Sequence, residues 1–260
     1  MLELYHFAGA ICAQKVRIAL AEKSIPWESR MTLDELRSPA YLKLNPNGYV
    51  PTLVHDGNVV TESRIINEYI DAAFPSPSLL PQSPIDRARV GLWTKQIDDS
   101  LHLNVYVLTF TAGFRERYRI MSPQELDSAL PLTNPIKRQY TLELLEHGFE
   151  SPLFALAVAR FCKLLADMET ALSRSAWLAG DSYSLADVDF APYLHRLDDL
   201  GLWPLLREAH PDVRRWISAV QARPSYKAAI LDWEIAKDGE RNRMVSAKAT
   251  PHFVNALNVI

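Results

Sequence analysis

The sequence predicts an α/β domain followed by an all-α domain. Short apolar runs alternate with helical segments through the first eighty residues, whereas nearly everything after Pro84 has helical periodicity. A proline-rich stretch, residues 74–81, separates the two regions and is typical of a linker. The chain of 260 residues is also at the length where single hydrophobic cores stop growing, roughly 250 residues, so two domains are expected.

The first region has the element order βαβαββα. Apolar residues alternate along the expected strands, and in the helices they recur three and four residues apart. Asp56-Gly57 joins two apolar runs and is typical of a β-hairpin turn. The expected strands are residues 2–7, 26–32, 50–54 and 58–61, and the expected helices are residues 14–23, a short polar segment after the second strand, and a segment that begins at residues 62–63.

The second region is expected to be a helical bundle, with helices at residues 85–114, 149–173, 186–200 and 211–222. Between the first two helices, Pro123, Pro131 and Pro135 break the helical periodicity, so we expect a long functional or flexible loop. The last residues suit either a loose tail or one that packs over a partner surface. The expected domains are residues 1–80 and 84–235, with a tail at 236–260.

Composition excludes several classes of protein. With 48% hydrophobic residues, 23% charged residues and a net charge of −3, the chain is neither a disordered protein nor a binder of nucleic-acid backbones. Its two cysteines, Cys12 and Cys162, suit neither a metal site nor a disulfide scaffold. No signal peptide is recognisable, and no apolar run reaches the roughly 20 residues that span a bilayer. We therefore expect a cytoplasmic protein without metal, membrane or nucleic-acid partners.

Val50-Pro51 lies between a turn and the start of a strand. Proline cannot donate to a β-ladder, so it suits a strand start or an edge, and its peptide bond can be cis. A cis bond would turn a backbone N–H and C=O outward, ready to pair with an extended peptide ligand. Both the plain strand start and the peptide-binding loop remain open.

Glu62 and Ser63 lie at a strand-to-helix junction. The N–H groups at the helix start favour a carboxylate, and Glu62 beside them can accept an ammonium group. The alternative is that Ser63 simply caps the helix.

Cys12 falls at or just before the start of the first helix. The helix dipole there lowers the pKa of a thiol below its reference value of about 8.5, and we expect nearby Lys15 to assist this effect. The alternative is a small buried hydrophobe, which is the reading we prefer for Cys162 on its apolar helical face.

Ser184 and Asp187 form a capping box, with Asp187 in the role that Glu or Gln usually takes. We expect this pair to be buried and to serve folding rather than catalysis.

Together these segments resemble the cytosolic glutathione transferases over most of the chain. The resemblance rests on Lys15 to Leu20 with Glu22-Lys23, on Asn45 to Leu53, on Glu62-Ser63, and on Trp177 to Gly180 running into Ser184 to Asp187. It implies a thioredoxin-like N-terminal domain that binds glutathione, an all-helical C-terminal domain that supplies the pocket for the second substrate, and a homodimer.

The resemblance also implies the glutathione contacts. Val50 would pair with the cysteinyl backbone of glutathione beside a cis Pro51, and Glu62 and Ser63 would hold the γ-glutamyl end. Tyr49 stands where the family often has Lys or Gln, so this glutathione contact differs from the usual one.

The catalytic loop departs from the family pattern. Aligned on Lys15-Val16-Arg17, Ala10 replaces the serine that activates the glutathione thiol; in another register Cys12 takes that place. Two routes then remain. Either the backbone N–H groups of Ala10 and Ile11 hold the thiolate with help from Cys12, or Cys12 is itself a nucleophile that forms a mixed disulfide with glutathione.

Within the family, the chain looks like the bacterial lignin β-aryl etherases around Val60 to Tyr69, Trp93 to Asp98 and Pro135-Ile136. This resemblance implies that the glutathione thiolate attacks an electrophilic aromatic substrate and displaces a phenolate. The expected substrate pocket contains Phe7, Ala8 and a helical stripe of His102, Tyr106 and Phe110, with His6 as a further polar candidate. A Cys12-dependent thiol exchanger or lyase and a non-catalytic binding module are the alternatives.

Overall fold

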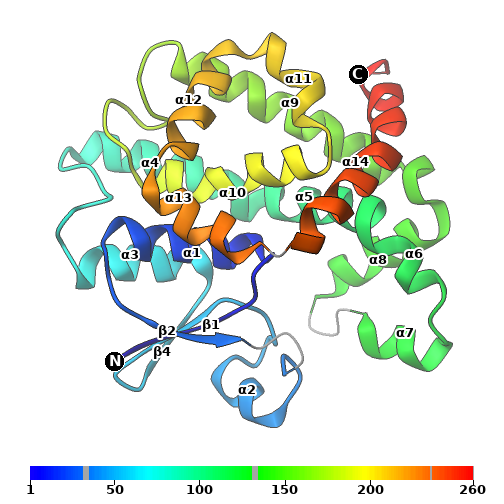
Figure 1. Ribbon diagram of the computed structural model, residues 1–260, viewed down its shortest axis with the longest axis horizontal. Coiled ribbons are helices and arrows are strands. Elements are labelled where there is room, and N and C mark those ends of the chain that lie inside the picture. Colours follow the sequence, from blue (N-terminus) through cyan, green and yellow to red (C-terminus); the bar gives the residue numbers. More distant parts are fainter. Residues whose placement is uncertain (32–34, 131–133, 235, 260) are drawn as a thin grey trace. The chain divides into compact units, whose positions relative to one another are not determined.

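The computed structural model describes residues 1–31, 35–130, 134–234 and 236–259 (Figure 1). Contacts divide the chain into two compact units. The first unit contains Met1–Thr94, Ala171–Leu194 and Arg214–Ile235, and the second contains Lys95–Thr170, His195–Val213 and Ala236–Ile260. Each unit therefore contains segments that are far apart in the sequence.

The predicted order βαβαββα is confirmed at the start of the chain. Its elements are β1 (Leu2–His6), α1 (Ile11–Glu22), β2 (Glu28–Met31), α2 (Pro39–Leu44), β3 (Thr52–His55), β4 (Asn58–Thr61) and α3 (Ser63–Ala73). The sheet order is β2-β1-β3-β4, with β1 parallel to β2 and antiparallel to β3. The predicted hairpin joins β3 to β4, and Asp56 and Gly57 both have positive φ at its turn.

One face of the sheet carries the core of this domain. Figure 1 shows α1 and α3 together on that face and α2 on the other. Leu4, Leu53, Val16, Leu20 and Ile66 are fully buried between the strands and the two helices. Helix α13 (Pro224–Ala229) also packs against α1. Because α1 is covered on two sides, even its Lys15 and Arg17 are buried.

The remaining helices of the first unit are the main part of α4 (Pro84–Gln96), the start of α10 (Leu185–Asp199), most of α12 (Pro211–Gln221), α13, and a 3-10 turn at Leu231–Trp233. The predicted capping box at the start of α10 is confirmed. Asp187 is fully buried and accepts from the backbone N–H and hydroxyl of Ser184, from the Leu178 N–H and from the Trp216 indole, at 2.8–3.1 Å. Burial raises the pKa of Asp187 to about 6, although these hydrogen bonds favour the carboxylate.

The expected helix at residues 85–114 forms as α4, a π-helical stretch (Ile97–Leu101), α5 (His102–Thr109) and a second π-helical stretch (Phe110–Phe114). The other helices of the second unit are α6 (Arg115–Arg119), α7 (Pro123–Ala129), α8 (Pro135–His147), α9 (Pro152–Leu172), α11 (Trp203–Leu206), α14 (Ala236–Leu257) and 3-10 turns at Gly148–Glu150 and Arg207–Ala209.

The prediction of a long loop between the first two bundle helices is wrong. Pro123 and Pro135 each begin a helix, because the first turn of a helix leaves its N–H groups unbonded and tolerates proline. Ser122 caps α7 in a capping box with Glu125, and Asn134 caps α8. Pro131 lies outside the described residues.

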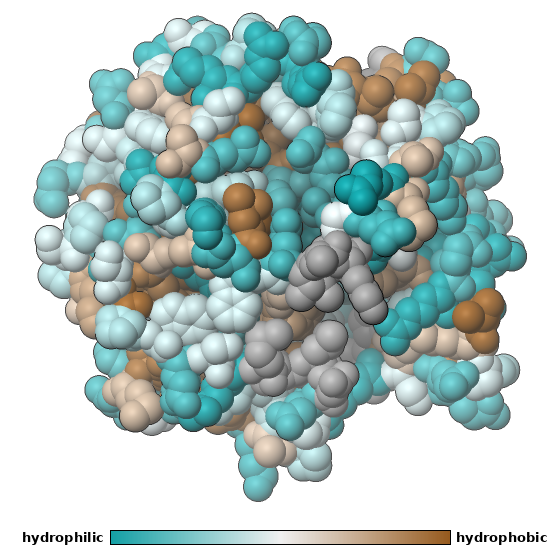
Figure 2. Space-filling view, viewed as in Figure 1, coloured by the Kyte–Doolittle hydropathy of each residue, from teal (hydrophilic) through white to brown (hydrophobic). Residues whose placement is uncertain are grey.

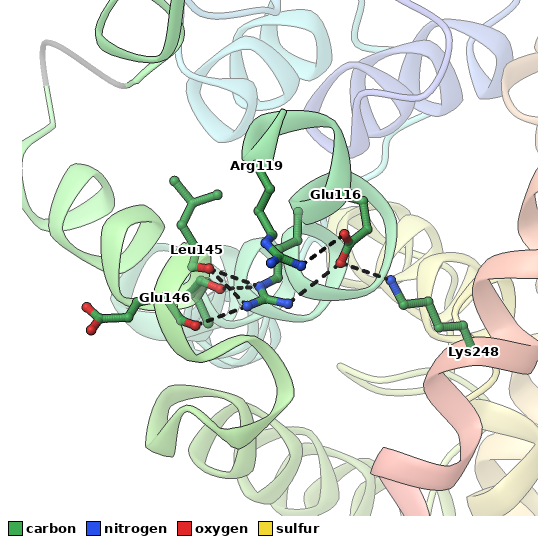
Figure 3. Close-up of polar contacts among 7 residues, drawn as sticks. Glu116, Arg119, Leu145, Glu146 and Lys248 are labelled. Carbon is green, nitrogen blue, oxygen red and sulfur yellow. Dashed lines mark hydrogen bonds and ion pairs between the residues drawn. The ribbon is translucent and has the colours of Figure 1, made fainter. Parts of the chain in front are cut away.

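Arg115 ties α6 to the end of α8. Its guanidinium donates to the carbonyls of Leu144, Leu145 and Glu146, at 2.9–3.2 Å, and so satisfies groups that the helix end leaves open (Figure 3). Gly148 follows with φ +58°, and a Cβ there would lie 2.7 Å from Cζ of Arg115. Both the backbone conformation and the contact with Arg115 therefore require glycine.

The predicted C-terminal tail forms helix α14, which packs within the second unit. Ala249 and Phe253 are fully buried, and His252 stacks on Phe149 with ring centroids 3.9 Å apart. Lys248 pairs with Glu116 of α6 (Figure 3). Although most residues of α14 are polar, these buried side chains hold the helix against the rest of the second unit.

No helix in the described parts of the chain combines the length and the apolar character that crossing a bilayer requires. On the face shown in Figure 2, apolar side chains are exposed singly or in small groups among polar ones.

Candidate functional site

The peptide bond between Val50 and Pro51, in the turn before β3, is cis. A cis bond is the form that the peptide-binding interpretation of this turn requires. Two buried side chains hold this turn. The Tyr41 hydroxyl and the Asn45 amide both donate to the carbonyl of Tyr49, at 2.5 and 2.8 Å, and both contact the Thr52 hydroxyl, at 2.9 and 3.1 Å. No local pattern predicts this role of Tyr41 and Asn45, because it depends on a fold in which α2 lies against this turn.

Val50 is half-buried and lies before the ladder, because β3 begins at Thr52. Among the described residues, its N–H and C=O have no hydrogen-bond partner. The Tyr49 side chain beside it is 37% exposed. The turn therefore offers an accessible backbone donor and acceptor to an extended peptide.

Glu62 lies at the junction between β4 and α3 with φ +66° and ψ 113°. This conformation is costly for a residue with a side chain, on the order of 1–3 kcal/mol, and is common at ligand-binding sites. Its side chain is exposed. The strain and the exposure together favour a binding role for Glu62.

Ser63 is the first residue of α3 and is buried. No side chain caps this helix, so the alternative that Ser63 is a simple N-cap is wrong. Its hydroxyl oxygen instead accepts a hydrogen bond from Nζ of Lys15, 3.1 Å away. Because the lysine occupies one lone pair of Oγ, the hydroxyl hydrogen of Ser63 can point to an anion at the helix N-terminus.

Lys15 belongs to a buried network beneath Ser63. Its Nζ lies 3.5 Å from Oδ1 of Asp189, which also accepts from the Asn67 amide at 2.8 Å. Lys15 and Asp189 are each 1% exposed. Our expectation that Lys15 assists Cys12 is therefore replaced by a role under Ser63. Asn67 and Asp189 were not predicted as members of the site, although Asp189 is a charged residue inside the apolar stretch after the capping box.

The loop before α1 presents an uncapped helix start. Ala10 is the N-cap residue and has no side-chain acceptor, and its own N–H donates to the Phe7 carbonyl at 3.2 Å. The first helical hydrogen bond runs from Gln14 to Ala10 at 2.9 Å. Within the described part of the chain, the Ile11 N–H has no acceptor. Ile11 thus supplies an open donor at the positive end of α1.

Cys12 is half-buried in the first turn of α1, and neither cysteine is in a disulfide within the described residues. Cys162 is half-buried on α9, and burial raises the pKa of its thiol. Of the two thiols, Cys12 is the one at the helix start.

His6 is fully buried, so the prediction that it lies near a pocket mouth is wrong. Its Nε2 lies 2.9 Å from the Ser29 hydroxyl and its Nδ1 lies 3.1 Å from Arg17. The ring packs edge-on against Trp27 and Trp233, with centroids 5.3 and 4.8 Å away. Burial and the positive charge of Arg17 lower the pKa of His6 to about 4.

This lowered pKa predicts a loss of stability in acid. The folded protein binds the His6 proton less tightly than the unfolded chain, whose histidine has a pKa of 6.5. The contribution of His6 is therefore fully present above pH 6.5 and is lost as the pH falls to about 4, by about 3 kcal/mol at most. Chemical denaturation between pH 4 and 7 measures this slope. We expect a shallower slope in His6→Gln, whereas the exposed-site control His147→Gln should keep the wild-type slope; equal slopes in all three proteins would contradict the prediction.

The predicted substrate stripe lies on one face of the helix in the second unit. The rings of Tyr106 and Phe110 are 5.6 Å apart. His102 is exposed, Tyr106 is half-buried and Phe110 is only 2% exposed, packed edge-on against Tyr118 at 5.1 Å. Phe110 is therefore a core residue of this unit. In the first unit, Phe7 and Ala8 are half-buried directly after β1.

The Tyr106 hydroxyl is already engaged. Thr141 donates its hydroxyl hydrogen to the Lys137 carbonyl at 2.7 Å, so Tyr106 is the donor in its 2.6 Å bond to the Thr141 oxygen. Nζ of Lys137 lies 4.3 Å from the centroid of the Tyr106 ring. Thr141 and Lys137, which contact Tyr106, both lie in α8, in the segment that was predicted to be a loop.

Two parts of the chain match family models. Residues 4–78 match the glutathione S-transferase N-terminal domain, and residues 150–224 match the glutathione S-transferase C-terminal domain. The chain is also 30% identical over 236 residues to protein LigF of Sphingobium sp. strain SYK-6, an alignment that covers 87% of this chain and 91% of LigF. The chain belongs to the glutathione S-transferase family.

Solved structures agree with this assignment. The crystal structure of the beta-etherase LigF from Sphingobium sp. strain SYK-6 matches with a TM-score of 0.79 and 28% identity, over 88% of this chain and 98% of that one. A maleylacetoacetate isomerase of Pseudomonas aeruginosa is 27% identical over 236 residues, covering 88% of this chain and 95% of the isomerase. Membership of the family makes glutathione the co-substrate of this glutathione transferase.

Proposed function

We propose that this glutathione transferase cleaves β-aryl ether bonds in lignin-derived aromatic compounds. The thiolate of glutathione attacks the ether-bearing carbon next to a ketone, a C–S bond forms, and the C–O bond breaks. The phenolate leaves with the electron pair and is then protonated. The similarity to LigF, which is named a beta-etherase, over about nine tenths of both chains is the observation that carries this proposal.

Glutathione fits the polar groups of the N-terminal domain. Its cysteinyl backbone pairs with the accessible backbone of Val50, beside Tyr49 and the cis Pro51. Its γ-glutamyl carboxylate takes the hydroxyl hydrogen of Ser63, and its ammonium group pairs with Glu62. Each pairing matches an acceptor with a donor or a negative charge with a positive one.

The thiolate lies at the start of α1. The open N–H of Ile11 and the helix dipole stabilise its negative charge, and Cys12 adds a weak S–H donor. The Ala10 N–H donates to the Phe7 carbonyl, so it gives no hydrogen bond to the thiolate. No side-chain hydroxyl of residue 10 takes part, because Ala10 has none.

An aryl substrate needs apolar walls and a polar group for its ketone. Phe7 and Ala8 supply an apolar wall next to the catalytic loop. In the second unit, His102 is exposed, and the Tyr106 ring packs against Phe110 on the same helical face. Positioning of the two reactants then contributes more to the rate than thiol activation alone.

Glutathione-dependent phenol release from an α-keto β-aryl ether tests this function. Wild type, Cys12→Ala and the control Cys162→Ala are compared. The proposal expects release by all three, with a reduced rate in Cys12→Ala. Release that vanishes in Cys12→Ala alone would make Cys12 the nucleophile of a thiol exchanger or lyase, and no release by any protein would refute ether cleavage and favour a non-catalytic binding module.

Replacing Ser63 by alanine should weaken glutathione binding about tenfold, because one hydrogen bond to a charged group is lost, worth about 1.5 kcal/mol. Isothermal titration calorimetry with glutathione measures this change. Glu68→Gln, on an exposed face of the same helix, is the matched control and should bind like the wild type. Equal affinity of Ser63→Ala and the wild type would remove Ser63 from the proposed site.

We also propose that the protein is a homodimer. Apolar side chains at Val59, Ile65, Ile85 and Leu92, on β4, α3 and α4 of the first unit, are 41–67% exposed, and a partner subunit would remove their apolar surface from water. Sedimentation equilibrium at micromolar concentration tests this. A monomer of 29.4 kDa at every concentration would contradict it.

A further inference from the structure

Arg17 is a buried cation without a carboxylate partner. It lies on α1 and is 1% exposed. Its guanidinium donates to the carbonyls of Ala229 and Ala8, both at 2.7 Å, to the Phe7 carbonyl at 3.4 Å, and lies 3.1 Å from Nδ1 of His6. All of these acceptors are neutral, and no carboxylate of the described residues pairs with Arg17.

The other buried cations near α1 are neutralised. Lys15 lies 3.5 Å from Asp189, and Lys23 lies 2.6 Å from Asp71. Burying a charge is costly unless an opposite charge or strong hydrogen bonds compensate it. Arg17 has the hydrogen bonds without the opposite charge, so the interior around it remains electrostatically positive.

Few other charges lie near this guanidinium. His6, from β1, is neutral at neutral pH because its pKa is about 4. On the side of α13, Trp233 lies with its ring centroid 5.0 Å from Cζ of Arg17. Lys227 and Asp232, the charged residues next to this contact, are at least half exposed and pair with each other. Burial lowers the pKa of Arg17 to about 10, so it stays charged at neutral pH.

Arg17 also fixes the loop that precedes α1. It holds the carbonyls of Phe7 and Ala8, and the Phe7 carbonyl accepts from Ala10 as well. Through Ala229, the same guanidinium fastens this loop to α13. Loop and helix start are therefore held by a single positively charged group.

We propose that Arg17 is a positioning residue of the thiolate site, which holds the loop at residues 7–10 and whose uncompensated positive charge stabilises the glutathione thiolate. This inference rests on the proposed binding of glutathione at the start of α1. It gives the site a source of thiol activation that does not depend on a hydroxyl at Ala10. The negative charge of the bound thiolate then compensates the positive charge of Arg17, which no carboxylate of the described residues neutralises.

The test is the pKa of enzyme-bound glutathione, measured by the ultraviolet absorbance of its thiolate across a pH series. Arg17→Gln should raise this pKa by about one unit, a tenfold loss of thiolate at a pH below both values. Arg17→Lys keeps the charge and should leave the pKa close to that of the wild type, while the lost loop contacts lower kcat. Arg30→Gln is the control, since Arg30 is paired with Glu3 and Glu28.

Each outcome decides the proposal. An Arg17→Gln protein that binds glutathione with an unchanged thiol pKa would overturn it. If Arg17→Gln does not fold, Arg17→Lys decides, because a rise of a full unit with the charge retained would refute the electrostatic role. The titration needs no ether substrate, so it is independent of ether cleavage. A wild type that binds glutathione without lowering its thiol pKa would refute both the thiolate site and the role of Arg17.

Discussion

Replacing Asp187 by alanine should destabilise the first unit by about 4 kcal/mol. The fully buried carboxylate accepts four hydrogen bonds, and alanine would leave their donors on Leu178, Ser184 and Trp216 without partners. Each unsatisfied buried donor costs about 1–3 kcal/mol, and loss of the helix cap adds about 1 kcal/mol. Urea denaturation followed by tryptophan fluorescence measures the loss.

Asp181→Ala is the matched control, because Asp181 is an exposed aspartate in the turn just before the same helix. Its unfolding midpoint should equal that of the wild type. An Asp187→Ala protein that unfolds within 1 kcal/mol of the wild type would show that the cap contributes little.

Replacing Lys15 by methionine should cost about 3–5 kcal/mol, because the buried carboxylate of Asp189 would lose the ammonium group that lies 3.5 Å from it. Glutathione affinity should fall as well, since Ser63 loses the partner that orients its hydroxyl. Thermal or urea unfolding gives the first quantity and calorimetry the second.

The double variant Lys15→Met with Asp189→Asn separates the two causes of this loss. Without a charge on residue 189, most of the stability should return, because a pair removed together costs far less than one partner removed alone. Glutathione binding should remain weak. If the double variant is as unstable as the sum of both single variants, Lys15 and Asp189 do not act as a pair.

Structural elements that depend on residues close together in the sequence were predicted correctly. The alternation in β1, the Asp56-Gly57 turn and the capping box of Ser184 and Asp187 depend on residues within a few positions of each other, and all three are confirmed. The same reasoning failed for residues 115–147, because a proline that begins a helix cannot be told from one that interrupts it without knowing where the helix starts.

The candidate site was predictable only in part. The family motif pointed to Val50, Pro51, Glu62 and Ser63, and the cis bond at Pro51 is present. Asp189 lies far along the chain from Lys15, and no local pattern couples them. His6 was misplaced for the same reason, since its burial depends on Trp233 near the other end of the chain.

Product analysis of the ether reaction tests the central claim most directly. The purified protein is incubated with isotopically labelled glutathione and an α-keto β-aryl ether, and the products are quantified by mass spectrometry. We expect one labelled glutathione thioether for each phenol released, because the thiolate forms a C–S bond at the carbon that loses the phenolate. Phenol released without glutathione, or with glutathione disulfide in place of the thioether as the first product, would contradict the account.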